Sequence, residues 1–208
     1  SPDSVFPNNW ISTHAGGHVA LYPMFVPNRR TERRQDIVEM LKSRYRVQDV
    51  IDYSGLELDD VFLEGTGAMV LDHELRIAYT ARSHRADPVI LERFCTNFGF
   101  EPIVFDALDP SGMPIYRTNV MLCIATDFVL AGRDLIVSDT RRAEVAARLS
   151  VAQQQRTLAG LRAHRLGAEM ICCGRQVGQG IDRPGRHHGR EVGRDVGQVG
   201  IAEVLAQV

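Results

Sequence analysis

A single carboxylate, Glu64, stands where the sequence indicates that a buried strand begins. Leu63 precedes it, and the glycine-rich segment Gly65-Thr66-Gly67 follows it. Two apolar runs, Gly67–Leu71 and Ile77–Ala81, are joined by a polar turn and predict a hairpin of buried strands. Because a charge at the start of a buried strand is costly unless it is paired, we expect a positively charged or amide-bearing molecule to bind Glu64.

A second group of polar residues lies at an equivalent place further along the chain. The segment Arg117-Thr118-Asn119 stands near the start of the apolar run Ile115–Ala125. This run predicts another buried strand. If the two strands begin at the same side of the fold, these polar side chains and Glu64 face a common space.

Two polar segments near the N-terminus have alternative interpretations. Asn8 and Asn9, beside Trp10, either line a pocket or form a turn that satisfies its own backbone, and we favour the turn. The basic segment 29–34 (RRTERR) either attracts anions or forms the solvated face of a helix, and the solvated face is the simpler interpretation.

Local signals predict three helices and the strands around them. Asp87 and Pro88 are typical of a helix cap and first turn, and Gly99 is typical of a helix end. The expected helices are Thr31–Arg44, Asp87–Phe98 and one that begins near Asp139. The strands expected beside the hairpin are His18–Met24, Val47–Tyr53, Glu101–Ala107, Ile115–Ala125, Asp127–Ala131 and Leu135–Val137.

These elements repeat in the order strand pair, helix, strand. The helices recur with a period of about 50–55 residues, which is typical of a repeat architecture. We therefore expect an α/β fold of ββαβ units arranged around a pseudo-symmetry axis, with the starts of the strands converging on the centre. Glu64 belongs to the second unit and Arg117-Thr118-Asn119 to the third.

The composition is that of an ordinary soluble domain. The chain has 208 residues, of which 44% are hydrophobic and 24% charged, and its net charge is −2. This balance excludes a general nucleic-acid footprint, and no apolar run is long enough to span a bilayer. The four cysteines, Cys95, Cys123, Cys172 and Cys173, lack zinc-like spacing. We expect reduced thiols, no metal, no nucleic-acid or membrane partner, and a cytoplasmic location.

The sequence changes character near its C-terminus. Residues 1–149 carry the repeated pattern, whereas residues 150–208 form an atypical Ala/Gln/Arg/Gly-rich tail. Residues 151–167 can be helical, and the glycine-rich part beyond Cys173 predicts poor order rather than nucleic-acid binding. A less favoured alternative makes the tail the working part of an interaction protein.

Four segments of the chain resemble one superfamily, in order and over about residues 2–149. They are PDSVFPNNWISTH, LYPMFVPNRRTERR, FLEGTGAMVLD and PIYRTNVMLCIA. The chain resembles the guanidino-group-modifying (pentein) superfamily of amidinotransferases, arginine deiminases and dimethylarginine hydrolases, nearest the citrulline-utilisation hydrolases. The resemblance implies a five-bladed α/β propeller of ββαβ units. It also implies C–N bond hydrolysis or amidino transfer on arginine, citrulline or methylarginine compounds, without a cofactor.

The resemblance also implies roles for particular residues. Members of the superfamily use a Cys nucleophile, a His general acid/base and carboxylates that hold the substrate's nitrogens. Glu64 stands at the position of the substrate-binding acid, and Asn119 two residues after the general acid/base. Asn8 and Asn9 correspond to a loop that lines the pocket. Ser83 and Arg85 stand where a substrate carboxylate can be held.

Two departures from the superfamily pattern predict impaired catalysis. Arg117 occupies the position of the catalytic His, and a guanidinium stays protonated near neutral pH, so it cannot exchange a proton. Arg117 would also repel a guanidinium substrate more than an uncharged ureido group. No nucleophilic-Cys motif follows Leu149, because Cys172 and Cys173 lack its context.

These departures leave several alternatives open. The chain is an impaired enzyme of the superfamily or, alternatively, a non-catalytic module that binds an amino acid through Glu64. The tail is compatible with a shifted reading frame, and five units need more chain than the 208 residues provide. A homo-oligomer is a further alternative, and the sequence does not decide whether a partner chain completes the ring.

Overall fold

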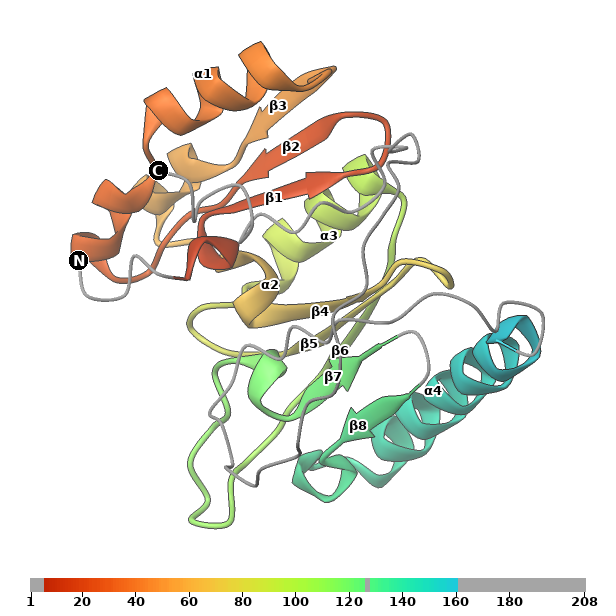
Figure 1. Ribbon diagram of the computed structural model, residues 1–208. Helices are drawn as coiled ribbons and strands as arrows, with labels where there is room; N and C mark the ends of the chain where they lie inside the picture. Colours follow the sequence, from red (N-terminus) through yellow and green to blue (C-terminus); the bar gives the residue numbers. More distant parts are fainter. Residues whose placement is uncertain (1–5, 126–127, 161–208) are drawn as a thin grey trace, which may run out of the picture.

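The computed structural model (Figure 1) describes residues 6–125 and 128–160. These residues form three separate sheets with related strand arrangements, one after another along the chain. The first sheet has the order β1-β2-β3 and the second the order β4-β5-β6. In each, the first two strands are antiparallel and the last two parallel. The strands are β1 Ile11–His14, β2 His18–Leu21, β3 Asp49–Asp52, β4 Met69–Asp72, β5 Ile77–Ala81 and β6 Glu101–Phe105.

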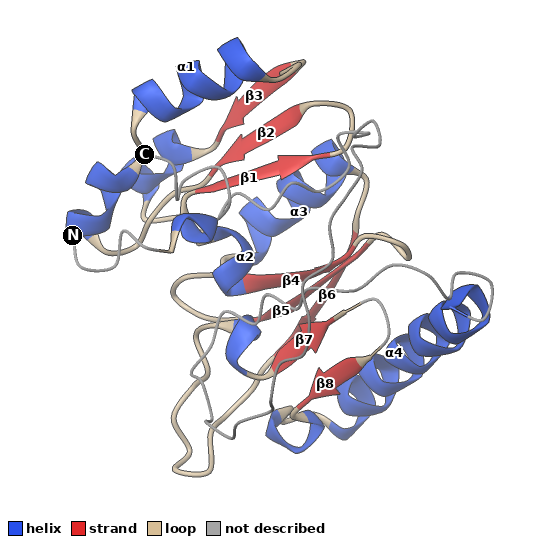
Figure 2. Cartoon of the chain, viewed as in Figure 1, coloured by secondary structure: helices blue, strands red, loops and turns tan. Residues whose placement is uncertain are grey.

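A helix connects the parallel strands in both units. Helix α1 (Gln35–Arg44) lies between β2 and β3 in the sequence, and α3 (Pro88–Phe98) between β5 and β6. The third unit pairs β7 (Leu122–Ile124) with β8 (Val129–Ala131), and α4 (Asp139–Gly160) follows it. The predicted ββαβ repeat is therefore confirmed in the first two units, and the third has its strand pair and helix (Figure 2).

Each central strand is buried on both faces because helices of two successive units cover it. Side chains of β5 alternate, so that Ala78 packs in the core cluster of α3 while Ile77 and Tyr79 pack in that of α4. Burial on both faces explains the continuous apolar run that predicted this strand. The central strand of the first unit, β2, alternates between the α1 and α3 clusters in the same way.

The local signals for α3 are confirmed. The Asp87 side chain accepts a hydrogen bond from the backbone N–H of Val89 at 2.7 Å, Pro88 opens the helix, and Gly99 ends it in the left-handed conformation, with φ of 67°. Side chains at helical spacing then face inward. These are Ile90, Leu91, Phe94, Cys95 and Phe98.

The predicted helix Thr31–Arg44 is wrong at its start. Residues Pro27–Glu32 form a separate 3₁₀ helix (η3), and α1 begins only at Gln35. Arg29 and Arg33 of this segment turn inward instead of forming a solvated helix face, whereas Arg34 stays exposed beside Asp36. Arg29 is 2% exposed and pairs with Glu32, and Arg33 binds Glu57.

The predicted strand Ile115–Ala125 is also wrong over its first half. Ile115 donates a backbone hydrogen bond to the Ala107 carbonyl at 2.9 Å, and Thr118–Val120 forms a 3₁₀ turn (η5). Only Leu122–Ile124 joins a sheet.

Several other predicted boundaries shift. Strand β4 begins at Met69, because Gly65–Ala68 is a short helix, α2. Residues Arg133–Leu135 form a 3₁₀ turn (η6) in place of the start of the predicted strand Leu135–Val137. The remaining 3₁₀ helices are η2 (Pro7–Asn9) and η4 (Ser54–Asp59).

Helix α4 crosses the predicted boundary at residue 149. Most of the predicted tail, including Cys172 and Cys173, lies outside the described residues. In the described part of the chain, no helix combines the length and apolar character of a membrane span.

Candidate functional site

Glu64 lies directly before α2 and makes polar contacts with several segments of the chain. Its side chain is 1% exposed. Gly65, which follows it, has φ of +45°, and a Cβ atom there would lie 2.2 Å from the carbonyl oxygen of Asn8. Only glycine lets the chain turn so tightly against the N-terminal segment. The glycine after the carboxylate therefore brings the first and second units together.

The N-terminal asparagines form a turn and also contact the site. Asn9 ends η2 and is 2% exposed, and its Nδ2 donates to Glu64 Oε2 at 3.5 Å. A Cβ on Gly67 would lie 2.7 Å from that same amide nitrogen. The carbonyl of Asn8 accepts a hydrogen bond from the Thr66 hydroxyl at 3.5 Å. Asn8 and Asn9 therefore form a turn, as we expected, and Asn9 also contacts Glu64 from this turn.

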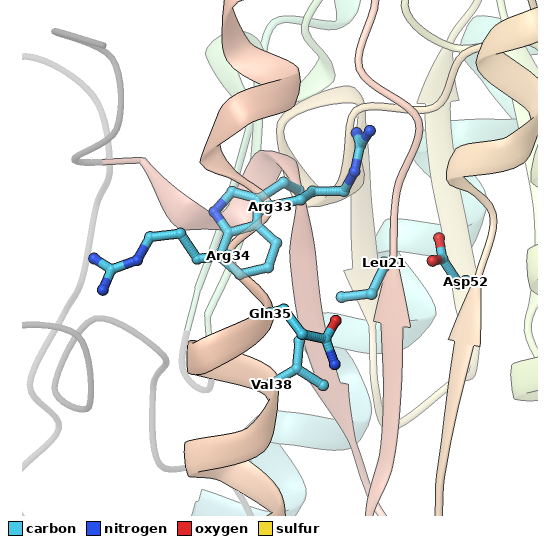
Figure 3. A pocket seen from close by; sticks show the side chains of 7 residues that line it. Leu21, Arg33, Arg34, Gln35, Val38 and Asp52 are labelled. Atoms are coloured by element: carbon cyan, nitrogen blue, oxygen red, sulfur yellow. The ribbon is translucent and has the colours of Figure 1, made fainter.

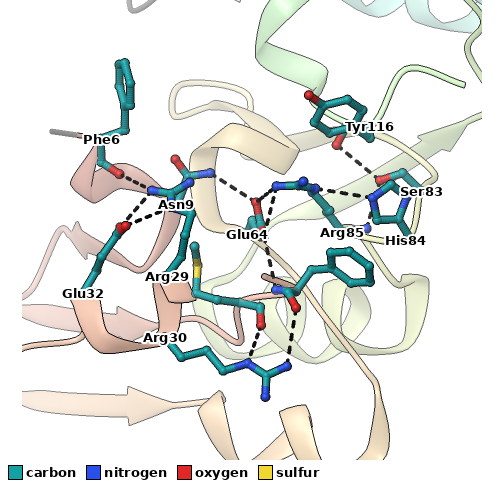
Figure 4. A network of polar contacts seen from close by, with 12 residues as sticks. Phe6, Asn9, Arg29, Arg30, Glu32, Glu64, Ser83, His84, Arg85 and Tyr116 are labelled. Carbon is teal, nitrogen blue, oxygen red and sulfur yellow. Dashed lines mark hydrogen bonds and ion pairs between the residues drawn. The ribbon is translucent and has the colours of Figure 1, made fainter. Parts of the chain in front are cut away.

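The cation that the buried carboxylate requires comes from the protein itself. Nη1 of Arg85 lies 3.1 Å from Oε2 and 3.4 Å from Oε1 of Glu64 (Figure 4). The backbone N–H of Phe25 donates to Oε1 at 3.2 Å. Glu64 is thus a carboxylate already engaged with a guanidinium, and its contacts come from Asn9, Phe25 and Arg85.

Aromatic rings surround the Arg85 guanidinium. Its Cζ lies 4.7 Å from the ring centre of Tyr116 and 5.6 Å from that of Phe25. Its Nε donates to Nε2 of His84 at 3.4 Å. Arg85 comes from the turn after β5 and Tyr116 from the third unit, so the contact joins two units around one carboxylate.

Ser83 supports this arrangement without touching Glu64. Its hydroxyl donates to the Tyr116 carbonyl at 3.3 Å and accepts a hydrogen bond from the backbone N–H of Arg85 at 3.2 Å. Ser83 therefore fixes the turn that carries Arg85 against the segment that carries Tyr116.

The segment Arg117-Thr118-Asn119 lies against α2, as the repeat predicts. The fully buried Thr118 hydroxyl donates to the Ala68 carbonyl and accepts from the backbone N–H of Ala81 at 2.8 Å. On either side, Nε of Arg117 and Oδ1 of Asn119 are buried with no hydrogen-bond partner among the described residues. Buried polar atoms are nearly always paired, so these two atoms mark where further polar groups fit.

The sequence analysis missed a supporting network behind Phe25. Glu57 accepts hydrogen bonds from the backbone N–H of Met24 at 2.6 Å and from Nη2 of Arg33 at 2.9 Å. Arg30 donates to the Met24 carbonyl at 2.9 Å. The network holds the Met24–Phe25 backbone against Glu64. Glu57 lies 24 residues from Arg33, so no local spacing signals this pairing.

Of the two described thiols, that of Cys95 is not an activated nucleophile. Cys95 packs in the α3 core, and burial raises the pKa of its thiol to about 12. A neutral, inaccessible thiol is a poor nucleophile. Cys123 is half-buried in β7. Among residues 6–125 and 128–160, no cluster of His, Cys, Asp and Glu side chains is placed to hold a metal ion.

A small pocket lies elsewhere, between α1 and the first sheet (Figure 3). Trp10, Leu21 and Val38 line its apolar part, and Arg33, Arg34 and Asp52 are its charged lining residues. None of the predicted site residues lines it, but Arg33, which supports the Met24–Phe25 backbone through Glu57, is one of its lining residues.

Comparison with known proteins agrees with this architecture. The sequence profile described as N,N dimethylarginine dimethylhydrolase, eukaryotic, matches residues 1–159. This narrows the resemblance to one of the three families that the sequence motifs suggested. Among proteins of curated function, no sequence matches the chain significantly.

Solved structures share the fold. The substrate-bound N-terminal domain of ArgZ, an arginine dihydrolase from the ornithine–ammonia cycle in cyanobacteria, is 17% identical with a TM-score of 0.56. That match covers 71% of this chain and 51% of the ArgZ domain. AgrE bound to L-arginine is 19% identical with a TM-score of 0.56, over 72% of this chain and 21% of AgrE. The chain thus spans about half of the ArgZ domain, and the pentein fold is confirmed.

Proposed function

Because the chain belongs to the family of eukaryotic N,N-dimethylarginine dimethylhydrolases, we propose that it binds an arginine-type amino acid through Glu64. The ligand's guanidino or ureido nitrogens donate to the carboxylate. The observation that carries the proposal is the position of Glu64. It is 1% exposed and already holds a guanidinium, that of Arg85, where the three units meet. A buried carboxylate that accepts N–H groups in this way is suited to such a ligand.

The neighbouring polar residues have roles in this proposal. Asn9 and the Phe25 N–H fix the orientation of the carboxylate, since both donate to it. The unpaired Asn119 Oδ1 accepts a ligand N–H. Asn8 supports the turn that positions Asn9. Ser83 and Arg85 hold the carboxylate of the bound amino acid once Arg85 has left Glu64.

The proposal includes impaired C–N hydrolysis or amidino transfer by this chain. Arg117 stands at the position of the general acid/base and cannot exchange a proton near neutral pH. The thiol of Cys95 offers no nucleophile beside Glu64, because Cys95 is buried in the α3 core. The alternative function, a non-catalytic amino-acid-binding module, is favoured by these same two observations.

Calorimetric titration with dimethylarginine, arginine and citrulline tests the binding proposal. We expect Glu64→Gln to weaken binding about 10- to 100-fold, the loss of one charge-assisted contact. The control is Glu92→Gln, which removes an exposed carboxylate on α3. Thermal melts must show that each variant is folded. Unchanged affinity in folded Glu64→Gln contradicts the proposal.

A parallel assay for ammonia, dimethylamine and urea-type products tests the impairment. We expect no turnover by the unmodified chain with any of the three compounds. Measurable turnover that disappears in Glu64→Gln refutes the impairment and identifies the chain as an active hydrolase or transferase.

A further inference from the structure

Arg85 occupies the Glu64 carboxylate as a bound ligand would. Its guanidinium touches both carboxylate oxygens and lies over the rings of Tyr116 and Phe25. The Arg85 side chain is 16% exposed, so its charge is largely removed from water. A singly alkylated guanidinium therefore fits this position, which has one acidic contact and two aromatic walls.

The aromatic walls are partly exposed to solvent. Phe25 is 38% exposed and Tyr116 is 43% exposed. Contacts with neighbouring rings hold them in place, since Phe25 lies 5.2 Å from Phe62, and His84 lies 4.6 Å from Phe25 and 5.8 Å from Tyr116. The site is thus a cage whose aromatic walls are held by neighbouring rings and are partly exposed to solvent.

Such a cage discriminates by charge and shape. A guanidinium is planar, weakly hydrated and attracted to the faces of aromatic rings, and it pairs with a carboxylate through parallel N–H groups. A neutral ureido group has a similar shape but gains no cation–π attraction. Phe25 and Tyr116 therefore add to the preference for a guanidinium over a ureido compound that the charge of Glu64 already provides.

We infer that Arg85 fills the cage formed by Glu64, Phe25 and Tyr116 until a guanidinium-bearing ligand displaces it, and that the two rings strengthen the preference of the site for this cation. The inference rests on the proposed function and adds an internal competitor and two rings that favour a cation. Arg85 is tethered beside the cage, so its effective concentration there is high and it lowers the apparent affinity for any ligand. No bond is made or broken in this exchange.

Ligand rescue of the full-length Arg85→Met variant tests the inference. Removal of Arg85 leaves the buried carboxylate unpaired, so the variant should melt at a lower temperature than the unmodified chain. Ethylguanidinium has the planar cation but no carboxylate, and ethylurea is its neutral counterpart. We expect ethylguanidinium to bind Arg85→Met at least about tenfold more tightly than the unmodified chain, and to raise its melting temperature. Ethylurea should do neither.

Further variants provide the control, test the two rings, and replace Arg85→Met if that variant does not fold. Arg82→Met is the matched control, because Arg82 is exposed and pairs with Asp106 rather than with Glu64. Adding Phe25→Leu or Tyr116→Leu to Arg85→Met should reduce ethylguanidinium binding. If Arg85→Met does not fold, Arg85→Lys keeps a charge without the planar group and should bind ethylguanidinium more tightly than the unmodified chain.

The inference is overturned if removal of Arg85 leaves ethylguanidinium affinity unchanged or lower, or if ethylurea binds Arg85→Met equally well. Addition of Glu64→Gln reports on the proposed function instead. If ethylguanidinium binds Arg85→Met equally well with and without the Glu64 carboxylate, the proposed function itself fails.

Discussion

The hydroxyl of Thr118 accepts a hydrogen bond from the backbone N–H of Ala81 at 2.8 Å, although 37 residues separate the two in the chain. The same hydroxyl donates to the Ala68 carbonyl. One fully buried oxygen thus joins the end of β5, the short helix α2 and the start of the third unit. The position of Arg117 and Asn119, which flank Thr118 next to α2, depends on this contact.

We expect Thr118→Val to lower the free energy of unfolding by roughly 2–4 kcal/mol, because it leaves a buried N–H and a buried carbonyl unpaired. Urea unfolding measures the loss. Thr118→Ser keeps the hydroxyl and should lose less than Thr118→Val. Thr140→Val, at an exposed site on α4, should change stability little. Equal effects at residues 118 and 140 would show that the hydroxyl has no structural role.

Gly65→Ala should disrupt the Glu64 site strongly, although the substitution adds only one methyl group. The added Cβ would meet the Asn8 carbonyl at 2.2 Å, and the φ of +45° is strained for any other residue. We expect a loss of roughly 2–4 kcal/mol in unfolding free energy and a weaker Asn9–Glu64 contact. Gly55→Ala is the matched control, because no atom lies within 4 Å of the added Cβ there. Equal stability of the two variants would contradict this prediction.

Stability should fall in mild acid because of His14. Burial, reinforced by the nearby His73 and Arg76, lowers the pKa of His14 from 6.5 to about 3. Between these pH values the unfolded chain binds a proton that the folded chain does not, so the stability falls as the pH falls through this window. From pH 7 to pH 5, this group removes about 2 kcal/mol.

Urea unfolding of the unmodified chain and of His14→Gln at pH 7 and pH 5 measures this effect. Gln cannot titrate, but its amide can still bind the Ser12 hydroxyl that lies 2.7 Å from His14 Nε2. The variant should therefore lose less stability on acidification. The same pH slope in both proteins would assign the acid sensitivity to other groups.

Local chemistry explains which elements were predictable. Helix α3 has its cap, proline and terminal glycine in adjacent positions, and these act through bonds within a few residues. The β4–β5 hairpin and the period of the ββαβ unit follow from apolar runs that two covering helices bury. Residues 29–34 have equally strong local features, yet Arg29 pairs with Glu32 and Arg33 with Glu57 inside the fold, and the predicted helix is broken there.

The sequence by itself determined the type of unit, its repetition, and the presence of an isolated carboxylate before a buried strand. Only the tertiary structure decided that Arg85 neutralises Glu64, and that Phe25 and Tyr116 enclose the pair. The reason is that secondary structure forms from interactions a few residues apart, whereas a buried charge selects its partner from whatever packing brings within about 4 Å. That partner lies 21 residues away in the chain, and the rings come from two other units.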